Sequence, residues 1–288
     1  MRKFSNERAD VFVPDGAALP GALERTTHLA VGAHQDDLEI MAYHGVAECY
    51  GRSSKWFTGV VATDGAGSPR AGIYGDYSDE QMQAVRHGEQ RKAAVIGEYA
   101  GLVQLMHRSS QVKDPAFSDV VTDLTAVLDQ ARPEVLYVHN PADKHDTHVA
   151  VTLRVLQAVR ALPSERRPAR VYGCEVWRDL DWTVDADKAV LPVDAHPNVA
   201  ASLLGVFDSQ ISGGKRYDLA AAGRRLANAT FFESHAVDTS DALTFALDLT
   251  ALFADDDKDP FEAVATYIDH FKEDVKQRIT KLGGEQKS

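Results

Sequence analysis

Short apolar segments alternate with longer segments of helical periodicity from about Thr27 onward, and this alternation constrains the fold more than any other feature of the chain. The apolar segments contain few polar interruptions, as expected of strands that are covered on both faces of a parallel sheet. They are residues 28–34, 56–63, 102–107, 134–140 and 169–177. We therefore predict an α/β fold with a Rossmann-like, mostly parallel sheet flanked by helices.

The segments between these predicted strands have the apolar spacing of helices. Ser78, followed three residues later by Gln81, predicts a capping box at the start of the clearest one, residues 79–99. Other helices are expected at residues 37–50, 115–130 and 145–161, each after a strand. Beyond about Pro192 the predicted elements are helices, at residues 198–207, 217–234 and 260–282.

The chain has 288 residues and no long linker, which favours a single domain over residues 1–288. We expect a core over about residues 27–235 and a helical C-terminal segment over about residues 236–288.

Charge and cysteine content exclude several classes of protein. The chain has 31 Lys and Arg against 43 Asp and Glu, a net charge of −12, which disfavours nucleic acid as a partner. Its N-terminal residues lack the apolar segment of a signal peptide or a membrane span, so we expect no membrane insertion. Cys49 and Cys174 form no metal-binding pattern and suit a reducing cytoplasm. A homo-oligomer is compatible with the sequence.

Ionisable residues cluster directly after the first predicted strand. The segment 33–39 reads AHQDDLE and contains His34, Asp36 and Asp37. In an open parallel sheet, ligands bind at the carboxyl ends of the strands, where this segment lies. The structural alternative is that Asp36 or Asp37 only caps the next helix.

A second cluster follows the fourth predicted strand, where His145 and His148 are three residues apart at a helix start and lie on one face. His34, Asp37 and His148 together predict a site of two imidazoles and one carboxylate with open positions, as a catalytic zinc requires. Asp36 and His145 then remain for proton transfer. Capping is again the alternative role for the residues at this helix start.

These segments resemble those of the PIG-L / LmbE-like family. AHQDDLE is similar to the AHPDDxE motif of that family, and ADKHDTHVAV, residues 142–151, to its DxHxDH segment. VVATDG at residues 60–65 and the pair Arg86 and Glu89 also match, and residues 207–210, FDSQ, resemble its later H-x-S-Q segment. The resemblance spans about residues 27–233.

This resemblance implies a zinc-dependent hydrolase that removes the N-acetyl group from an N-acetylglucosamine-type sugar conjugate, a small molecule. It makes His34, Asp37 and His148 the ligands of Zn2+ or another divalent transition metal. It makes Asp36 the general base and His145 the oxyanion stabiliser or general acid.

The chain departs from the family pattern at two places. Gln35 replaces the usual proline, and Thr147 replaces the aspartate expected before the metal-binding histidine. Either Asp143 or Asp146 therefore remains as the carboxylate that would tune His145.

The Gly-rich segment after the second strand, residues 65–77, is expected to overhang the site and to carry specificity. Within and before it, Arg70 and Asp64 are candidate substrate ligands, with a solvated surface position and a turn as their structural alternatives. Two other functions are compatible with the sequence: a non-catalytic sugar-binding relative of the family, and a metal-dependent hydrolase of another bond.

Overall fold

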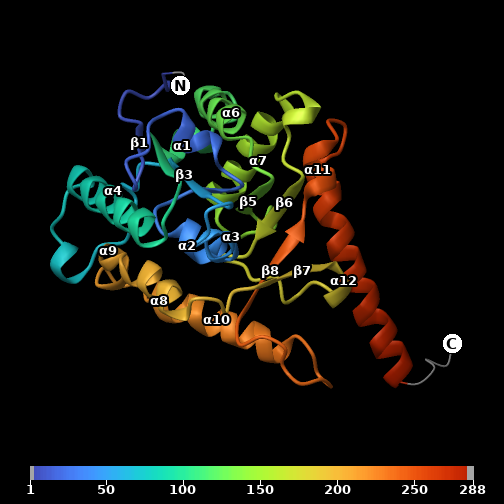
Figure 1. Cartoon of the computed structure of the whole chain (residues 1–288). Coiled ribbons are helices and arrows are strands. Elements are labelled where there is room, and N and C mark those ends of the chain that lie inside the picture. The colour runs from blue at the N-terminus through green and yellow to red at the C-terminus, as the bar shows by residue number, and fades with distance from the viewer. Residues whose placement is uncertain (1–2, 284–288) are drawn as a thin grey trace.

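The fold is an eight-stranded sheet with helices on both faces (Figure 1). The computed structural model describes residues 3–283. The strands are β1 (Asp10–Phe12), β2 (His28–Gly32), β3 (Phe57–Thr63), β4 (Gly101–His107), β5 (Val135–His139), β6 (Arg170–Cys174), β7 (Lys188–Pro192) and β8 (Leu243–Asp248). The helices are α1 (Gly21–Glu24), α2 (Asp37–Met41), α3 (Tyr43–Cys49), α4 (Asp79–Ile96), α5 (Ser109–Lys113), α6 (Asp119–Ala131), α7 (Asp146–Arg160), α8 (Pro197–Gly205), α9 (Asp208–Ile211), α10 (Tyr217–Phe231), α11 (Thr250–Ala254) and α12 (Pro260–Gly283).

The strand order creates one point at which the chain reverses direction across the sheet. The order is β1-β4-β3-β2-β5-β6-β8-β7, and β2 pairs in parallel with both β3 and β5. The chain runs outward from β2 through β3 and β4 and then returns to the other side of β2 as β5. Loops after β2 and β5 therefore diverge and leave a crevice at their carboxyl ends. The predicted Rossmann-like, mostly parallel fold is confirmed.

Successive strand residues face two separate apolar cores, as the pleat of a strand requires. Leu29 and Val31 of β2 belong to the core formed with α6 and α7, whereas Ala30 between them faces α2, α3 and α4. Both faces of β2 are thus covered, which explains why its sequence is continuously apolar.

Helix α4 begins as its sequence predicts. The backbone N–H of Gln81 donates to Ser78 Oγ at 3.3 Å, and the backbone N–H of Ser78 donates to Gln81 Oε1 at 2.7 Å. This capping box satisfies two amide groups at the helix N-terminus. The buried face of α4 is mixed, because Gln83, Arg86, Glu89 and Gln90 are buried together with Met82, Ala93 and Ala94.

Strands near the C-terminus were missed by the sequence analysis. β8 lies between β6 and β7 and is antiparallel to both, so residues after 236 contribute to the central sheet as well as to helices. The apolar run of β8, LTFALD, is short and rich in Ala and Leu, and periodicity alone does not separate such a run from a helix. The helix expected over residues 37–50 is instead divided at Ala42 into α2 and α3.

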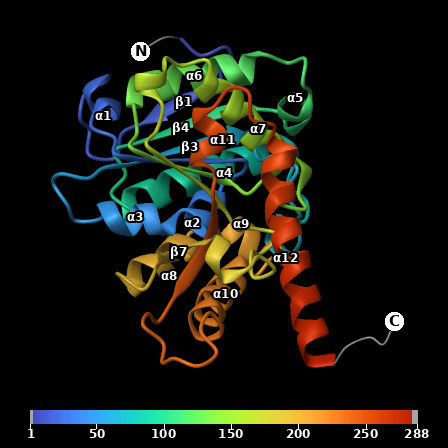
Figure 2. The ribbon, with the colours of Figure 1, turned by 90° about the vertical axis from the view of Figure 1, so that its right-hand side faces the viewer.

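Helix α12 extends away from the body of the protein toward the C-terminus, as Figures 1 and 2 show from two directions. Within residues 3–283, no helix combines the length and the apolarity needed to span a bilayer.

Candidate functional site

The turn between β2 and α2 holds His34 and Asp37 against each other. The backbone N–H of His34 donates to Asp37 Oδ2 at 2.6 Å, and His34 Nδ1 lies 3.2 Å from the same oxygen. Asp36, between them, has φ +95°, in the left-handed region that non-glycine residues seldom adopt. Such backbone strain costs about 1–3 kcal/mol and is typical of functional sites. Asp36 lines a cavity at this edge of the sheet.

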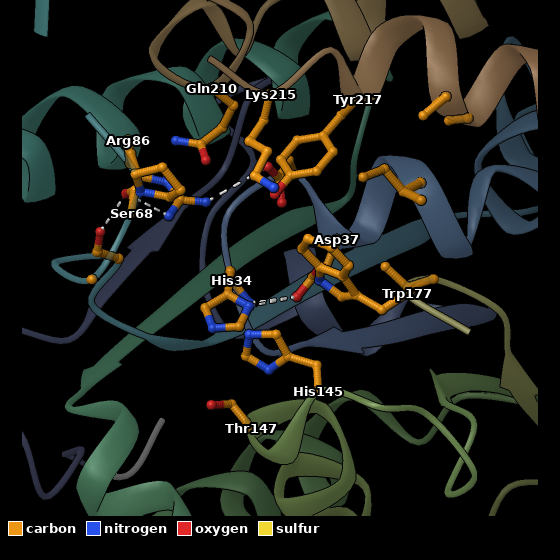
Figure 3. Close-up of a pocket in the computed structure, with 18 of the residues that line it drawn as sticks. His34, Asp37, Ser68, Arg86, His145, Thr147, Trp177, Gln210, Lys215 and Tyr217 are labelled. Carbon is orange, nitrogen blue, oxygen red and sulfur yellow. Dashed lines mark hydrogen bonds and ion pairs between the residues drawn. The ribbon is translucent and has the colours of Figure 1, made fainter. Parts of the chain in front are cut away.

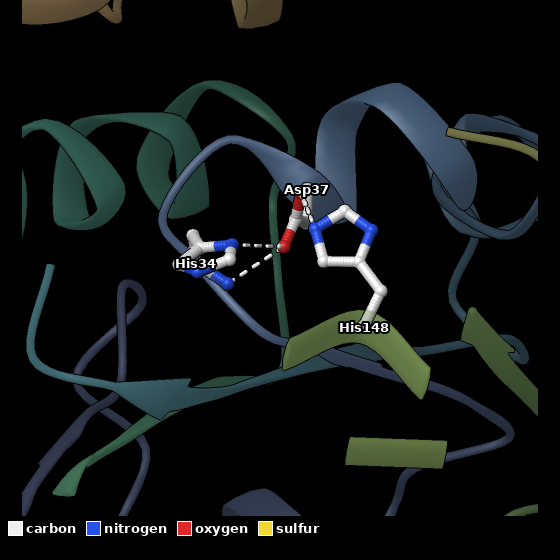
Figure 4. Close-up of side chains that lie close together, drawn as sticks. All are labelled: His34, Asp37 and His148. Atoms are coloured by element: carbon white, nitrogen blue, oxygen red, sulfur yellow. Dashed lines mark hydrogen bonds and ion pairs between the residues drawn. The ribbon is translucent and has the colours of Figure 1, made fainter. Parts of the chain in front are cut away.

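His148 reaches the same place from helix α7. Its Nε2 lies 3.4 Å from Asp37 Oδ1, and one ligand atom from each of His34, Asp37 and His148 can be chosen so that all lie within 4.8 Å of one another (Figure 4). Sequence analysis predicted these three residues as a ligand set, and the structure brings them together.

A divalent metal fits this donor set. His148 Nε2 is buried and has no hydrogen-bond partner among the described residues. The other ring nitrogen, Nδ1, lies 3.1 Å from Asp143 Oδ2. A carboxylate that accepts a hydrogen bond from Nδ1 commonly orients a metal-binding histidine and leaves Nε2 free for the ion. Burial would raise the pKa of Asp37, but the neighbouring His148 and His139 hold it well below its usual range.

A second histidine–carboxylate group, His139, Asp143 and His148, supports the first. The rings of His139 and His148 stack with centroids 3.8 Å apart, and the backbone N–H of Ala33 donates to His139 Nε2 at 2.9 Å. Both histidine rings are fully buried. Because Asp143 is already bonded to His148, this group fixes the position of His148 and does not face the cavity.

The structure distinguishes the two aspartates that the sequence left open. Asp143 accepts hydrogen bonds from His148 Nδ1 and from the backbone N–H of His145, Trp177 and Arg178. Asp146 is exposed at the first position of α7. Asp143 therefore orients His148 and the backbone at His145, and its bonds do not reach the imidazole of His145.

His145 and Asp36 also line the cavity, next to the ligand set. The His145 ring lies 5.1 Å from the His34 ring and 4.5 Å from the His148 ring, between centroids. Burial, with the neighbouring His148 and His34, lowers the pKa of His145, so its imidazole is neutral near pH 7. Burial raises the pKa of Asp36 well above its usual value, and Arg86, 3.6 Å away, opposes this shift.

The cavity has a volume of about 710 Å³ and is large enough for a sugar-sized ligand. Figure 3 shows Gln210, Lys215 and Tyr217 across the cavity from His34 and His145. Trp177, which the sequence offered as a possible stacking partner for a sugar ring or a core residue, lines the cavity. Lys215, Tyr217 and Arg224 were missed by the sequence analysis as site residues. Nothing in their local sequence marks them, because they reach the site only through the packing of α10 and the segment before it.

Arg86 and Glu89 of α4 connect the first motif to the segment before α10. Arg86 donates to the backbone carbonyl of Gln35 at 2.5 Å and to Ser68 Oγ at 2.8 Å. Glu89 accepts from the backbone N–H of Ser209 at 2.8 Å and from its hydroxyl at 2.6 Å. One turn of α4 therefore positions two walls of the cavity.

The predicted substrate ligands Asp64 and Arg70 lie outside the cavity lining. Asp64 is buried and accepts from Gln83 Nε2 at 3.0 Å. Arg70 donates to the backbone carbonyls of Tyr77 and Ala66 and pairs with Asp79. Both side chains therefore stabilise the conformation of the loop after β3. Their spacing along the sequence does not reveal this structural role.

The fold and the site define a class: an α/β protein with a histidine–carboxylate cluster at the switch point of a parallel sheet. Residues 29–159 match the family model described as PIG-L, GlcNAc-PI de-N-acetylase. The match confirms the resemblance of the motifs within these residues, from AHQDDLE to ADKHDTHVAV.

Solved structures of low sequence identity share the fold. The N,N'-diacetylchitobiose deacetylase from Pyrococcus horikoshii is 14% identical with a TM-score of 0.60, over 80% of this chain and 86% of its own. The A40926 pseudoaglycone deacetylase is 14% identical with a TM-score of 0.54, over 78% and 97%. The 4-carboxy-2-hydroxymuconate hydratase from Pseudomonas putida KT2440 is 14% identical with a TM-score of 0.58, over 78% and 96%. No curated protein matches the chain.

Proposed function

We propose that this protein is a metal-dependent N-deacetylase acting on an N-acetylglucosamine-type sugar conjugate, with zinc or another divalent transition metal as cofactor. The observation that carries the proposal is the grouping of His34, Asp37 and His148 beside Asp36 and His145; all of these but the buried His148 line the cavity. The PIG-L match over residues 29–159 supports the substrate class. The free, buried thiols of Cys49 and Cys174 suit a cytoplasmic enzyme.

His34, Asp37 and His148 would hold the metal. When bound, a divalent metal would supply Lewis acidity and would lower the pKa of water enough for hydroxide to attack an amide near pH 7. The described side chains then have to position the amide, move protons and stabilise charge.

Asp36 is placed to accept the proton of the attacking water. Its Oδ2 is buried without a hydrogen-bond partner among the described residues, so the oxygen is available to a ligand. The raised pKa of Asp36 brings the carboxylate closer to the value at which a base works best near neutrality. Arg86 opposes that rise.

His145 is placed to donate a hydrogen bond to the oxygen of the amide. Its Nδ1 is buried and has no partner among the described residues. Because the imidazole is neutral near pH 7, His145 offers one N–H to the developing oxyanion. A proton collected from water can then pass to the leaving amine, so that the C–N bond breaks and acetate and a free amine result.

Two substitutions test the proposal on purified protein. His148→Ala should lose the bound metal, measured by elemental analysis, together with acetate release from N-acetylglucosamine and N,N'-diacetylchitobiose. Asp36→Asn should keep the metal but lower kcat by about 10²–10⁴-fold, the usual contribution of a general base. Asp146→Asn, exposed on the same edge, is the control and should behave as the wild type.

Metal retention without acetate from any N-acetylated sugar would refute the deacetylase. The next function to test is then a hydratase, because a solved structure with a TM-score of 0.58 is a hydratase. Water activated at the same site would add across a conjugated double bond, and loss of ultraviolet absorbance would report it. Failure to bind metal even after reconstitution would favour a non-catalytic sugar-binding protein.

A further inference from the structure

Two cations line the wall of the cavity that α10 and the preceding loop form. Lys215 and Arg224 both face the cavity, and within residues 3–283 no carboxylate lies within 4.0 Å of either side chain. Lys215 Nζ lies 5.2 Å from the centre of the Trp177 ring. One N–H group of the Arg224 guanidinium donates to the backbone carbonyl of Val176. The other N–H groups remain available to a ligand.

The acidic residues near these cations are bonded to other groups. Asp218 pairs with Arg216 at 2.7 Å. Glu175 is buried and accepts from Asn228 and from the backbone N–H of Phe245. Among the described lining residues, the carboxylates are Asp36 and Asp37, and neither forms an ion pair with Lys215 or Arg224. Two lining cations without an ion-pair partner among the described residues are notable in a chain whose net charge is −12.

We propose that Lys215 and Arg224 form a subsite for an anionic group of the substrate, a carboxylate or a phosphate. This inference rests on the proposed deacetylase function and narrows its substrate to an acidic N-acetylated amino-sugar conjugate. Charged hydrogen bonds from lysine and arginine are the ordinary means of binding such groups.

Trp177 connects this anion subsite to the reacting end of the cavity. Its ring centre lies 6.0 Å from that of His145 and 6.1 Å from that of Tyr217. A sugar ring held beside Trp177 would direct its amide toward His145 and its anionic substituent toward Lys215.

The test compares acidic and neutral substrates of similar size. N-acetylglucosamine 6-phosphate and N-acetylmuramic acid are the acidic probes, and N-acetylglucosamine and N,N'-diacetylchitobiose are the neutral ones. The wild type should prefer the acidic probes in kcat/KM. Lys215→Met and Arg224→Met should each lower that preference about tenfold, mainly through KM, as loss of one charged hydrogen bond implies.

The variants have matched controls. Methionine removes the charge of Lys215 while it leaves an unbranched apolar side chain that can pack on Trp177. Arg224→Lys retains the charge and should recover most of the preference. Lys272→Met removes an exposed charge on α12 that does not line the cavity. It should leave the preference for acidic probes unchanged.

A binding measurement separates failure of this inference from failure of the proposed function. Calorimetric titration of the Asp36→Asn variant with the four probes should show tighter binding of the acidic pair even if acetate release is absent. Equal binding and equal kcat/KM for acidic and neutral probes would overturn the anion subsite, whether or not deacetylation occurs.

A second inference comes independently from helix α12. Its residues Ile268, Phe271, Val275, Ile279 and Leu282 recur every three or four positions and are between 37% and 83% exposed. This spacing places them in one apolar stripe along the helix. Monomeric soluble proteins seldom expose so continuous a stripe.

Among the described residues, the hydrogen bonds and ion pairs that hold α12 to the rest of the protein lie in its first half. Val264 is buried, Tyr267 donates to the backbone carbonyl of Asp248 at 3.1 Å, and His270 pairs with Asp187 at 2.8 Å. Figures 1 and 2 show the second half extending from the body. An isolated helical segment shorter than about 12–15 residues is marginal in water without an apolar partner.

The geometry points to a second copy of this chain as the partner, with the two α12 helices antiparallel. Residues 260–271 contain the acids Glu262 and Asp269 and no Lys or Arg, whereas residues 272–283 contain four basic residues and two acidic ones. An antiparallel pair places the acidic half of each helix on the basic half of the other. A two-fold axis gives this self-complementary contact naturally.

Sedimentation velocity at increasing concentration tests the pairing. The wild type should form a dimer that Ile279→Glu abolishes and that Lys281→Glu weakens. Gln277→Ala, which lies outside the stripe and changes no charge, is the control and should remain a dimer. A wild-type chain that stays monomeric at high micromolar concentration, or a dimer that Ile279→Glu leaves intact, would overturn this inference.

Discussion

Replacement of Asp143 by asparagine tests whether the site depends on a carboxylate behind His148. Asp143 Oδ2 accepts from His148 Nδ1 at 3.1 Å and from the backbone N–H of Trp177 at 3.2 Å. Asp143 Oδ1 accepts from the backbone N–H of His145 at 3.2 Å and of Arg178 at 3.3 Å. Each oxygen thus receives two donors.

An amide cannot reproduce this arrangement, because its NH₂ group faces two donors in either orientation. Two hydrogen bonds are lost, and each buried donor left without a partner costs about 1–3 kcal/mol of folding stability. Loss of the charge behind a metal-binding histidine lowers metal affinity by about 10–100-fold. This corresponds to roughly 1.4–2.7 kcal/mol of binding free energy.

Metal affinity is measured by competition with a chromophoric chelator, and folding stability by urea unfolding of the same samples. Asp146→Asn is the matched control, three residues away and exposed, and should change neither quantity appreciably. The reasoning is refuted if Asp143→Asn binds metal as tightly as the wild type, or if Asp146→Asn weakens binding to the same extent.

Two further predictions concern stability and the cavity wall. Burial, with Lys55 nearby, lowers the pKa of His28 to about 4, so the unfolded chain takes up a proton first as the pH falls from about 6.5. The free energy of unfolding therefore rises with pH between about 4 and 6.5, by up to roughly 3 kcal/mol from this group. In urea unfolding, His28→Gln should reduce the dependence of this free energy on pH over that window. A dependence equal to that of the wild type contradicts the assignment. Glu89→Ala should leave the N–H and hydroxyl of Ser209 without partners, cost about 1–3 kcal/mol, and raise KM through a loosened wall, measured by unfolding, by hydrogen exchange of residues 207–216 and by steady-state kinetics; wild-type exchange in that segment would contradict it.

Local sequence patterns were enough to predict the parallel sheet, the capping box of α4 and the grouping of His34, Asp37 and His148. These features depend on continuous apolar segments, on residues three apart at a helix start, and on the rule that strand ends share one edge of a sheet. Each signal lies within a few neighbouring residues, so no long-range contact is needed to find it.

The tertiary structure alone decided which polar groups meet across the sheet. Asp143 rather than Asp146 binds His148, Arg70 and Asp64 shape their own loop, and Lys215, Trp177 and Arg224 complete the cavity from segments far along the chain. Strand β8 likewise becomes identifiable only through its pairing with β6 and β7. A side chain's partner depends on how helices and loops pack, and contacts of this range leave no periodic trace in the sequence.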